Sequence, residues 1–313
     1  MITFPTILGP DGGQLVLQTL TPPAVYLDTW AIRYFAEDNP GAGSRFRTAL
    51  LRAGGTLVFS DLNIAEFTLF DDPRHARAAG LFIDSLAPHL FFTKFDPFLV
   101  MKAEVAIMVR QTDQSAAGDS EMLRIYAEDA EKLRGRPSVR PWFSAVQLAR
   151  PELKPDVAGM GRAFLAGIRS SQERFDTELG FKNSARRDVE TSRRPRSTQA
   201  LLRAMLYRVQ GDRRQKLSIN DAVDILHSIV PGAYCDFVLL DGRSELRLKA
   251  ASEWLDEAGI ESHVALPFSL SGVTRFLEAL EAWPAIGVPS ATAIYGGKLI
   301  TPRPARNECP GPA

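Results

Sequence analysis

The segment Ser218–Asp241, SINDAVDILHSIVPGAYCDFVLLD, constrains the fold of this chain more than any other. Its first half has the apolar periodicity of a helix, with two rows formed by Ile219, Val223 and Leu226 and by Ala222, Ile225 and Ile229. The run FVLL that follows is typical of a buried parallel strand. A buried helix that leads directly into a buried strand indicates an α/β fold.

Polar residues interrupt this apolar segment at positions that suggest a site. Asn220, Asp224 and His227 are spaced i, i+4 and i+7 and share one helix face, with Asp221 beside them. Asp241 follows the strand at its carboxyl end, where open α/β sheets bind ligands. Because buried unpaired carboxylates are costly, we expect a metal ion or a cation-lined cleft as their partner.

Two earlier strands place further acids at the same kind of position. Asp28 follows the apolar run 24–27, and Glu66 lies on the helix that follows the run 56–59. Strands that alternate with helices predict a parallel sheet flanked by helices. We therefore expect the carboxylates listed here to converge on one edge with no compensating Lys or Arg: Asp28, Glu66, Asp224 or Asp221, and Asp241. Such oxygen ligands suit Mg²⁺ or Mn²⁺, which support phosphodiester hydrolysis by an activated water.

The pattern changes between residues 92 and 216, where long helical stretches follow one another. We interpret 92–216 as a large all-helical insertion that divides an α/β core into 24–91 and 217–285. Residues 1–23 are expected to form an extended N-terminal arm with a hairpin turn at 9–13. The Pro- and Gly-rich tail 286–313 is expected to be partly disordered.

The end of the insertion is strongly basic. Residues 182–216 contain eleven Lys or Arg and three acids, whereas the whole chain has a net charge of zero. Clustered cations with few acids favour phosphate binding, and we predict nucleic-acid contacts from Arg186, Arg187, Arg193, Arg194 and Arg196.

Composition bears on the cellular compartment and on whether the chain has cysteine-based sites. The two cysteines, Cys235 and Cys309, make neither a disulfide framework nor a Cys-based metal site, so a reducing compartment is expected. The N-terminus lacks the pattern of a signal peptide, and no run of about 18 apolar residues is present. We therefore predict a cytoplasmic protein that does not associate with membranes.

Three stretches in this order, VYLDTWAIRYFAED, SDLNIAEFTLF and NDAVDILH…CDFVLLD, resemble the PIN-domain (PIN-like) nuclease family. The resemblance covers roughly 24–90 and 217–285, and its specificity lies in the order of the acids. It implies a PIN-like parallel sheet between helices and metal ligation by Asp28, Glu66, Asp224 or Asp221, and Asp241. Of the two helix acids, Asp224 is favoured because its distance of 17 residues to Asp241 fits the family's helix-to-strand step.

The resemblance also implies divalent-metal-dependent cleavage of RNA, whether single-stranded or structured. It leaves open an antitoxin-like protein partner and a homodimer. Two departures from the family pattern are the Trp at position 30, where a small polar residue is common, and the long gap between Glu66 and Asp221. They keep an alternative open, namely a catalytically inactive PIN-like module that binds RNA or protein.

Overall fold

A five-stranded parallel sheet lies at the centre of the molecule. The computed structural model describes residues 1–3, 15–110, 115–132, 138–190, 197–211, 216–285 and 295–300. The strand order is β5-β4-β3-β6-β7, with β3 (Ala24–Leu27), β4 (Thr56–Ser60), β5 (Leu90–Thr93), β6 (Phe237–Leu239) and β7 (Leu266–Phe268). All four pairings are parallel. The predicted α/β class, with a parallel sheet flanked by helices, is confirmed.

The two faces of the sheet supply two separate cores. Val25 and Leu27 of β3 belong to one cluster, and Ala24 and Tyr26 belong to the other, because successive side chains of a strand point to opposite faces. Helices α2 (Pro40–Ala53), α4 (Pro73–Asp84) and α13 (Val273–Glu281) pack into the first cluster. Helices α10 (Thr198–Gly211), α11 (Ile219–Tyr234) and α12 (Gly242–Glu257) pack into the second.

Short helical elements begin where the strands end. Strand β3 leads into α1 (Thr29–Arg33) and the π-helical turn η1 (Tyr34–Asp38), and β4 leads into α3 (Asp61–Glu66) and the 3₁₀ turn η2 (Phe67–Leu69). Strand β6 leads into α12, and β7 leads into η3 (Leu270–Gly272). Because the strands are parallel, all these helix starts lie at one edge of the sheet, the carboxyl edge.

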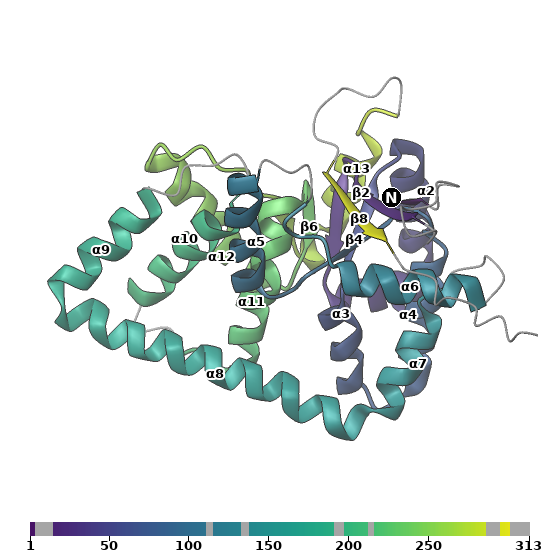
Figure 1. The fold of residues 1–313 in the computed structure, drawn as a ribbon, viewed down its shortest axis with the longest axis horizontal. Coiled ribbons are helices and arrows are strands. Elements are labelled where there is room, and N and C mark those ends of the chain that lie inside the picture. The colour runs from purple at the N-terminus through teal and green to yellow at the C-terminus, as the bar shows by residue number, and fades with distance from the viewer. Residues whose placement is uncertain are drawn as a thin grey trace, which may run out of the picture.

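The segment between β5 and α11 is helical where it is described. It contains α5 (Pro97–Arg110), α6 (Ser120–Lys132), α7 (Arg140–Leu148), α8 (Arg150–Thr177), α9 (Leu179–Glu190) and α10. Figure 1 shows α8 as one long helix that runs from α7 to α9 and passes α3 and α11. At Gly161 of α8 a Cβ atom would lie 2.8 Å from the side chains of Ile219 and Val223, so α8 packs closely against α11.

One expectation about the boundaries is wrong. The helical segment was predicted to start at residue 92, but Phe92 belongs to β5, the edge strand that pairs with β4. The run LFFT is too short and too uniformly apolar for its periodicity to separate a strand from a helix.

A second, antiparallel sheet joins the two ends of the chain. It has the order β1-β2-β8, with β1 (Ile2–Thr3), β2 (Leu15–Leu20) and β8 (Tyr295–Ile300). Strand β8 lies in the tail that was expected to be partly disordered, and it pairs with all six residues of β2. The predicted hairpin turn at 9–13 lies outside the described residues. Among the helices in the described part of the chain, none is long and apolar enough to cross a membrane.

Candidate functional site

Two of the predicted acids cap the helices that follow neighbouring strands. Asp28 is the N-cap of α1, and its Oδ1 accepts a hydrogen bond from the Thr29 amide at 2.6 Å. Asp241 is the N-cap of α12, and its Oδ1 accepts from the Arg243 amide at 2.7 Å and the Ser244 amide at 3.2 Å. Strands β3 and β6 pair directly, and the Asp28 amide donates to the Leu239 carbonyl at 3.0 Å. Both caps accept these amide hydrogen bonds through Oδ1, and the Asp241 backbone also hydrogen-bonds the Asp28 carboxylate.

The other two acids come from helices on either side of these strand ends. Glu66 is the last residue of α3, is buried, and accepts a hydrogen bond on Oε2 from the Thr29 hydroxyl. Asp224 lies one turn into α11 and is partly buried. Thr29 therefore fixes both Asp28, through its amide, and Glu66, through its hydroxyl.

The electrostatics show that the four acids share one region. Burial and, to a smaller extent, the charge of Asp241 raise the pKa of Asp28 from 3.8 to about 7, although the hydrogen bond from the Thr29 amide lowers it. Burial raises the pKa of Glu66 well above 4.5, and the charges of Asp28 and Asp224 add to that increase. Burial also raises the pKa of Asp224 to about 7, with contributions from Asp241 and Asp28. Asp28, Glu66, Asp224 and Asp241 therefore interact electrostatically at the carboxyl edge.

His227 lies against the same carboxylates. Its Nδ1 is 3.7 Å from Asp28 Oδ1 and 3.6 Å from Glu66 Oε1. One ligand atom from each of these three residues lies within 4.8 Å of the others, a spacing that could hold a metal ion. Burial lowers the pKa of His227 to about 3, so its ring is neutral at pH 7.

A buried hydrogen-bond chain indicates which ring nitrogen of His227 carries the proton. Asn63 Oδ1 accepts from the Ser60 amide at 2.9 Å, which fixes the orientation of the Asn63 amide group. Asn63 Nδ2 then donates to the Leu27 carbonyl at 3.1 Å and to the Tyr26 hydroxyl at 3.0 Å. Since the Tyr26 oxygen accepts from Asn63, its own proton is free to be donated to His227 Nε2. The proton of the neutral ring is then on Nδ1 and faces the carboxylates.

Asp221, the predicted alternative to Asp224, has other partners. It forms a capping box with Ser218 at the start of α11, in which its Oδ2 accepts from the Ser218 amide at 2.9 Å. Its Oδ1 accepts from Arg247 Nη2 at 2.6 Å and from Arg243 Nη1 at 3.1 Å. These donors lower the pKa of Asp221 against the opposing effect of burial, which is the largest single contribution. Asp221 therefore stabilises the start of α11 and contacts two arginines.

Arg247 corrects the expectation that no cation lies near the acids. Its side chain is 9% exposed, and its charge lowers the pKa of Asp224. Within the described residues its Nε and Nη1 have no hydrogen-bond partner. The separation of 23 residues between Asp224 and Arg247 hides this pairing in the sequence, since α11 and α12 come together only in the folded molecule.

The predicted nucleic-acid residues are described only in part. Arg186 lies on α9 and is exposed, whereas the side chain of Arg187 and all of Arg193, Arg194 and Arg196 lie outside the described residues. Asp236 precedes β6, at the opposite end of that strand from Asp241, and accepts from the Ala24 amide at 2.7 Å.

The site also includes residues that the sequence did not single out. Tyr26 belongs to a uniformly apolar strand, and its position on the α11 face is set by alternation alone. Asn63 had a usable signal, because Ser60 and Asn63 have the spacing of a capping box. Both residues contact His227, which the sequence had placed on the same helix face as Asp224.

Comparison with protein-family models, with curated proteins and with solved structures found no match to this chain.

Proposed function

We propose that this protein is a divalent-metal-dependent endoribonuclease of the PIN-like type. The observation that supports this most is the gathering of Asp28, Glu66, Asp224 and Asp241 at the carboxyl edge of a parallel sheet. The charges of these acids raise one another's pKa values, as at Asp28, Glu66 and Asp224. A divalent cation bound among them would remove this repulsion.

The donor set fits a hard cation such as Mg²⁺ or Mn²⁺. Carboxylate oxygens are the ligands these ions prefer, and nearby ligand atoms of Asp28 and Glu66 already lie within 4.8 Å of each other. The N-caps hold Asp28 and Asp241 through Oδ1, so both side chains are oriented before any ion binds. With its proton on Nδ1, His227 faces the Asp28 and Glu66 carboxylates at 3.7 and 3.6 Å, and that nitrogen is not available as a metal ligand.

The chain's residues have distinct roles in the proposed hydrolysis. A bound divalent cation supplies positive charge that activates water and stabilises the leaving oxygen. Asp28, Glu66, Asp224 and Asp241 hold that cation, while the Thr29 hydroxyl orients Glu66. Arg247 donates to Asp221 and lowers the pKa of Asp224, so its charge partly offsets that of the acids.

The order of the acids along the chain supports the PIN-like assignment. An Asp after a central strand, a Glu on the next strand's helix, an Asp on a later helix and an Asp after the following strand resemble that family. The parallel sheet and its flanking helices agree with the fold that the resemblance implies.

Cleavage of labelled RNA in the presence of Mn²⁺ tests this proposal. The wild-type protein should cut RNA with Mn²⁺ and not with EDTA, and Asp28→Asn and Glu66→Gln should each abolish cleavage. Asp236→Asn is the matched control, because Asp236 lies at the opposite end of β6 and its asparagine can still accept from the Ala24 amide. Wild-type protein that binds RNA but cleaves nothing with Mn²⁺ would instead favour the inactive binding module.

A further inference from the structure

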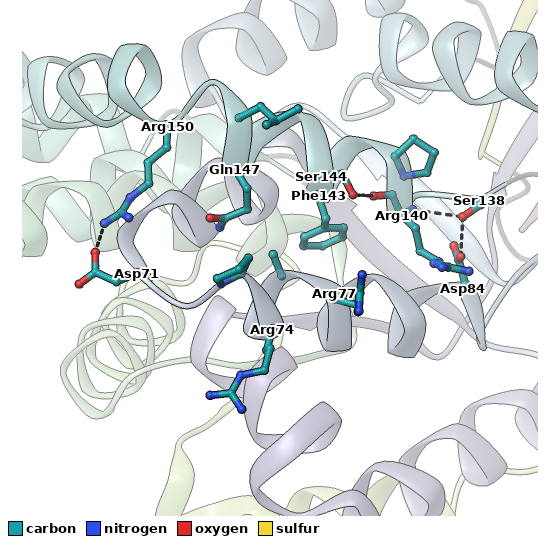
Figure 2. Close-up of a pocket in the computed structure, with 14 residues that line it drawn as sticks. Asp71, Arg74, Arg77, Asp84, Ser138, Arg140, Phe143, Ser144, Gln147 and Arg150 are labelled. Carbon is teal, nitrogen blue, oxygen red and sulfur yellow. Dashed lines mark hydrogen bonds and ion pairs between the residues drawn. The ribbon is translucent and has the colours of Figure 1, made fainter.

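A groove of about 1210 Å³ lies between α4 and α7. Figure 2 shows α4 and α7 as its two walls, with side chains from both helices facing the space between them. The two helices approach closely at Gly80, where a Cβ atom would lie 3.1 Å from Arg140 Cγ and 3.3 Å from Phe143 Cδ2. The buried ring of Phe143 lines the groove from α7, so its shape is set by packed side chains.

The groove carries an excess of positive charge. Its lining contains four arginines, Arg74, Arg77, Arg140 and Arg150, and two aspartates, Asp71 and Asp84. Both aspartates have protein donors, because Asp71 pairs with Arg150 and Asp84 accepts from the Ser138 hydroxyl at 2.6 Å and the Val139 amide at 2.8 Å. The charge of Asp71 is therefore paired, Asp84 is hydrogen-bonded by neutral donors, and the lining keeps a net positive charge.

Two of the four arginines remain available. Arg150 pairs with Asp71, and Arg74 pairs with Asp72 at 2.6 Å and points away from α7 in Figure 2. Arg77 of α4 is exposed and Arg140 of α7 stands opposite it. Within the part of the chain that the structure describes, neither guanidinium forms an ion pair or hydrogen bond. Two exposed cations without ion pairs on facing helices are complementary in charge to an anionic ligand that spans the groove.

One end of the groove is tied to the segment that carries Glu66. Gln147 Nε2 donates to the Phe67 carbonyl at 2.7 Å, and Arg150 Nε donates to the Thr68 carbonyl at 2.7 Å. Phe67 and Thr68 belong to η2, which follows Glu66 directly. A ligand that lies along the groove therefore ends beside η2, the turn that directly follows Glu66.

We infer that this groove binds the sugar-phosphate backbone of single-stranded RNA and leads the strand toward the acid cluster, an inference that rests on the proposed ribonuclease function. Arg77 and Arg140 contact successive phosphates, which is the usual role of Arg at a polyanion. Leu148, which lines the groove and is 85% exposed, offers an apolar contact to an unstacked base. Single strands combine such apolar contacts with cationic tracks along their backbone.

Figure 1 shows that this surface is distinct from the predicted basic region. Helix α9, which carries Arg186, and helix α7 lie at opposite ends of the molecule's longest axis. The groove thus adds a second RNA contact, closer along the chain to Glu66.

Fluorescence anisotropy with a labelled single-stranded oligoribonucleotide in EDTA tests the inference without cleavage. Neutralising two phosphate contacts in Arg77→Gln/Arg140→Gln should weaken binding about 25-fold at about 0.1 M salt and reduce the slope of log K against log salt by about 1.4. Arg77→Lys/Arg140→Lys, which keeps both charges, should bind close to wild type. Arg47→Gln/Arg169→Gln, two exposed arginines on α2 and α8, is the matched control and should leave the affinity unchanged.

Equal RNA affinity of Arg77→Gln/Arg140→Gln and wild type, or no RNA binding by wild type, would overturn the inference. Mn²⁺-dependent hydrolysis of bis(p-nitrophenyl) phosphate, measured on the same proteins, reports on the acid cluster alone. If Arg77→Gln/Arg140→Gln loses RNA affinity but wild type does not hydrolyse the diester, the proposed function is refuted and the groove inference is supported. If wild type hydrolyses the diester but Arg77→Gln/Arg140→Gln binds RNA as tightly as wild type, the groove inference is refuted and the proposed function is supported.

Discussion

Replacing Asp28 with Asn should stabilise the metal-free protein at pH 8. Asp28 is buried, and its pKa is raised from 3.8 to about 7 by burial and by the charge of Asp241. Since one pKa unit corresponds to about 1.4 kcal/mol, ionising Asp28 in the folded protein costs about 4 kcal/mol relative to the unfolded chain. Asn is a good N-cap, so its side-chain oxygen can still accept from the Thr29 amide.

The expected change in unfolding free energy depends on pH. Between pH 4 and pH 7 the folded protein binds more protons at Asp28 than the unfolded chain, so this group's contribution to stability falls as the pH rises. Asp28→Asn removes that contribution. The variant should therefore gain up to about 4 kcal/mol of unfolding free energy over wild type at pH 8, and the gain should vanish toward pH 4.

Urea denaturation in EDTA at pH 4.5 and at pH 8 measures this difference directly, with unchanged slopes showing that the unfolded states are comparable. The reasoning is refuted if Asp28→Asn is less stable than wild type at pH 8, or if its gain does not depend on pH. Either result would mean that the Asp28 carboxylate is stabilised by partners in the metal-free protein.

Three other substitutions test the surroundings of the site by the same unfolding measurement. Asp221→Asn should lose about 3–5 kcal/mol, because it leaves the buried guanidinium of Arg247 without its partner; an unchanged midpoint would contradict that pairing. Tyr26→Phe removes the hydroxyl that joins Asn63 to His227 and should cost about 1–3 kcal/mol, so a loss well below that range would argue against the buried chain. Gly161→Ala should cost about 1–3 kcal/mol through its clash with α11, whereas Gly167→Ala, with open space at its Cβ, should be neutral or stabilising; equal effects would contradict the close packing of α8.

The positions of the acids could be predicted because they follow from local patterns. Asp28 and Asp241 each end an apolar run, and strand ends of a parallel sheet meet at one edge. Asp224 lies on a helix whose periodicity is clear in the sequence. Chemistry at the ends of strands and on one helix face is therefore accessible to sequence reasoning.

The contacts that orient these acids could not be predicted, because they join elements that are distant in the chain. Asn63, Tyr26 and His227 come from three elements, and nothing in any one of them specifies the others. The proximity of Arg247 to Asp224 likewise depends on how α11 and α12 pack. The capping box of Asp221 with Ser218 is local, but its arginine partners become visible only once α11 and α12 are in place.

An Asp that follows a strand can be an ordinary helix N-cap or part of a functional site, and the sequence alone does not separate these two roles. Asp28 and Asp241 are N-caps, which is the ordinary structural role of an Asp after a strand. The pKa of Asp28, raised mainly by burial, distinguishes it from Asp72, the N-cap of α4, whose pKa is lowered to about 2 by Arg74. The cost of burying carboxylates, rather than their place in the sequence, indicates a cation site.

Titration with Mn²⁺, with free ion detected by electron paramagnetic resonance, tests the central claim most directly. If Asp28, Glu66, Asp224 and Asp241 hold one cation site, wild type binds Mn²⁺ stoichiometrically, and Asp224→Asn binds it at least tenfold more weakly. Asp221→Asn, three residues earlier on the same helix, should retain the wild-type affinity at a temperature where it is folded. Wild-type protein that binds no Mn²⁺, or equal affinity in wild type and Asp224→Asn, would contradict the account.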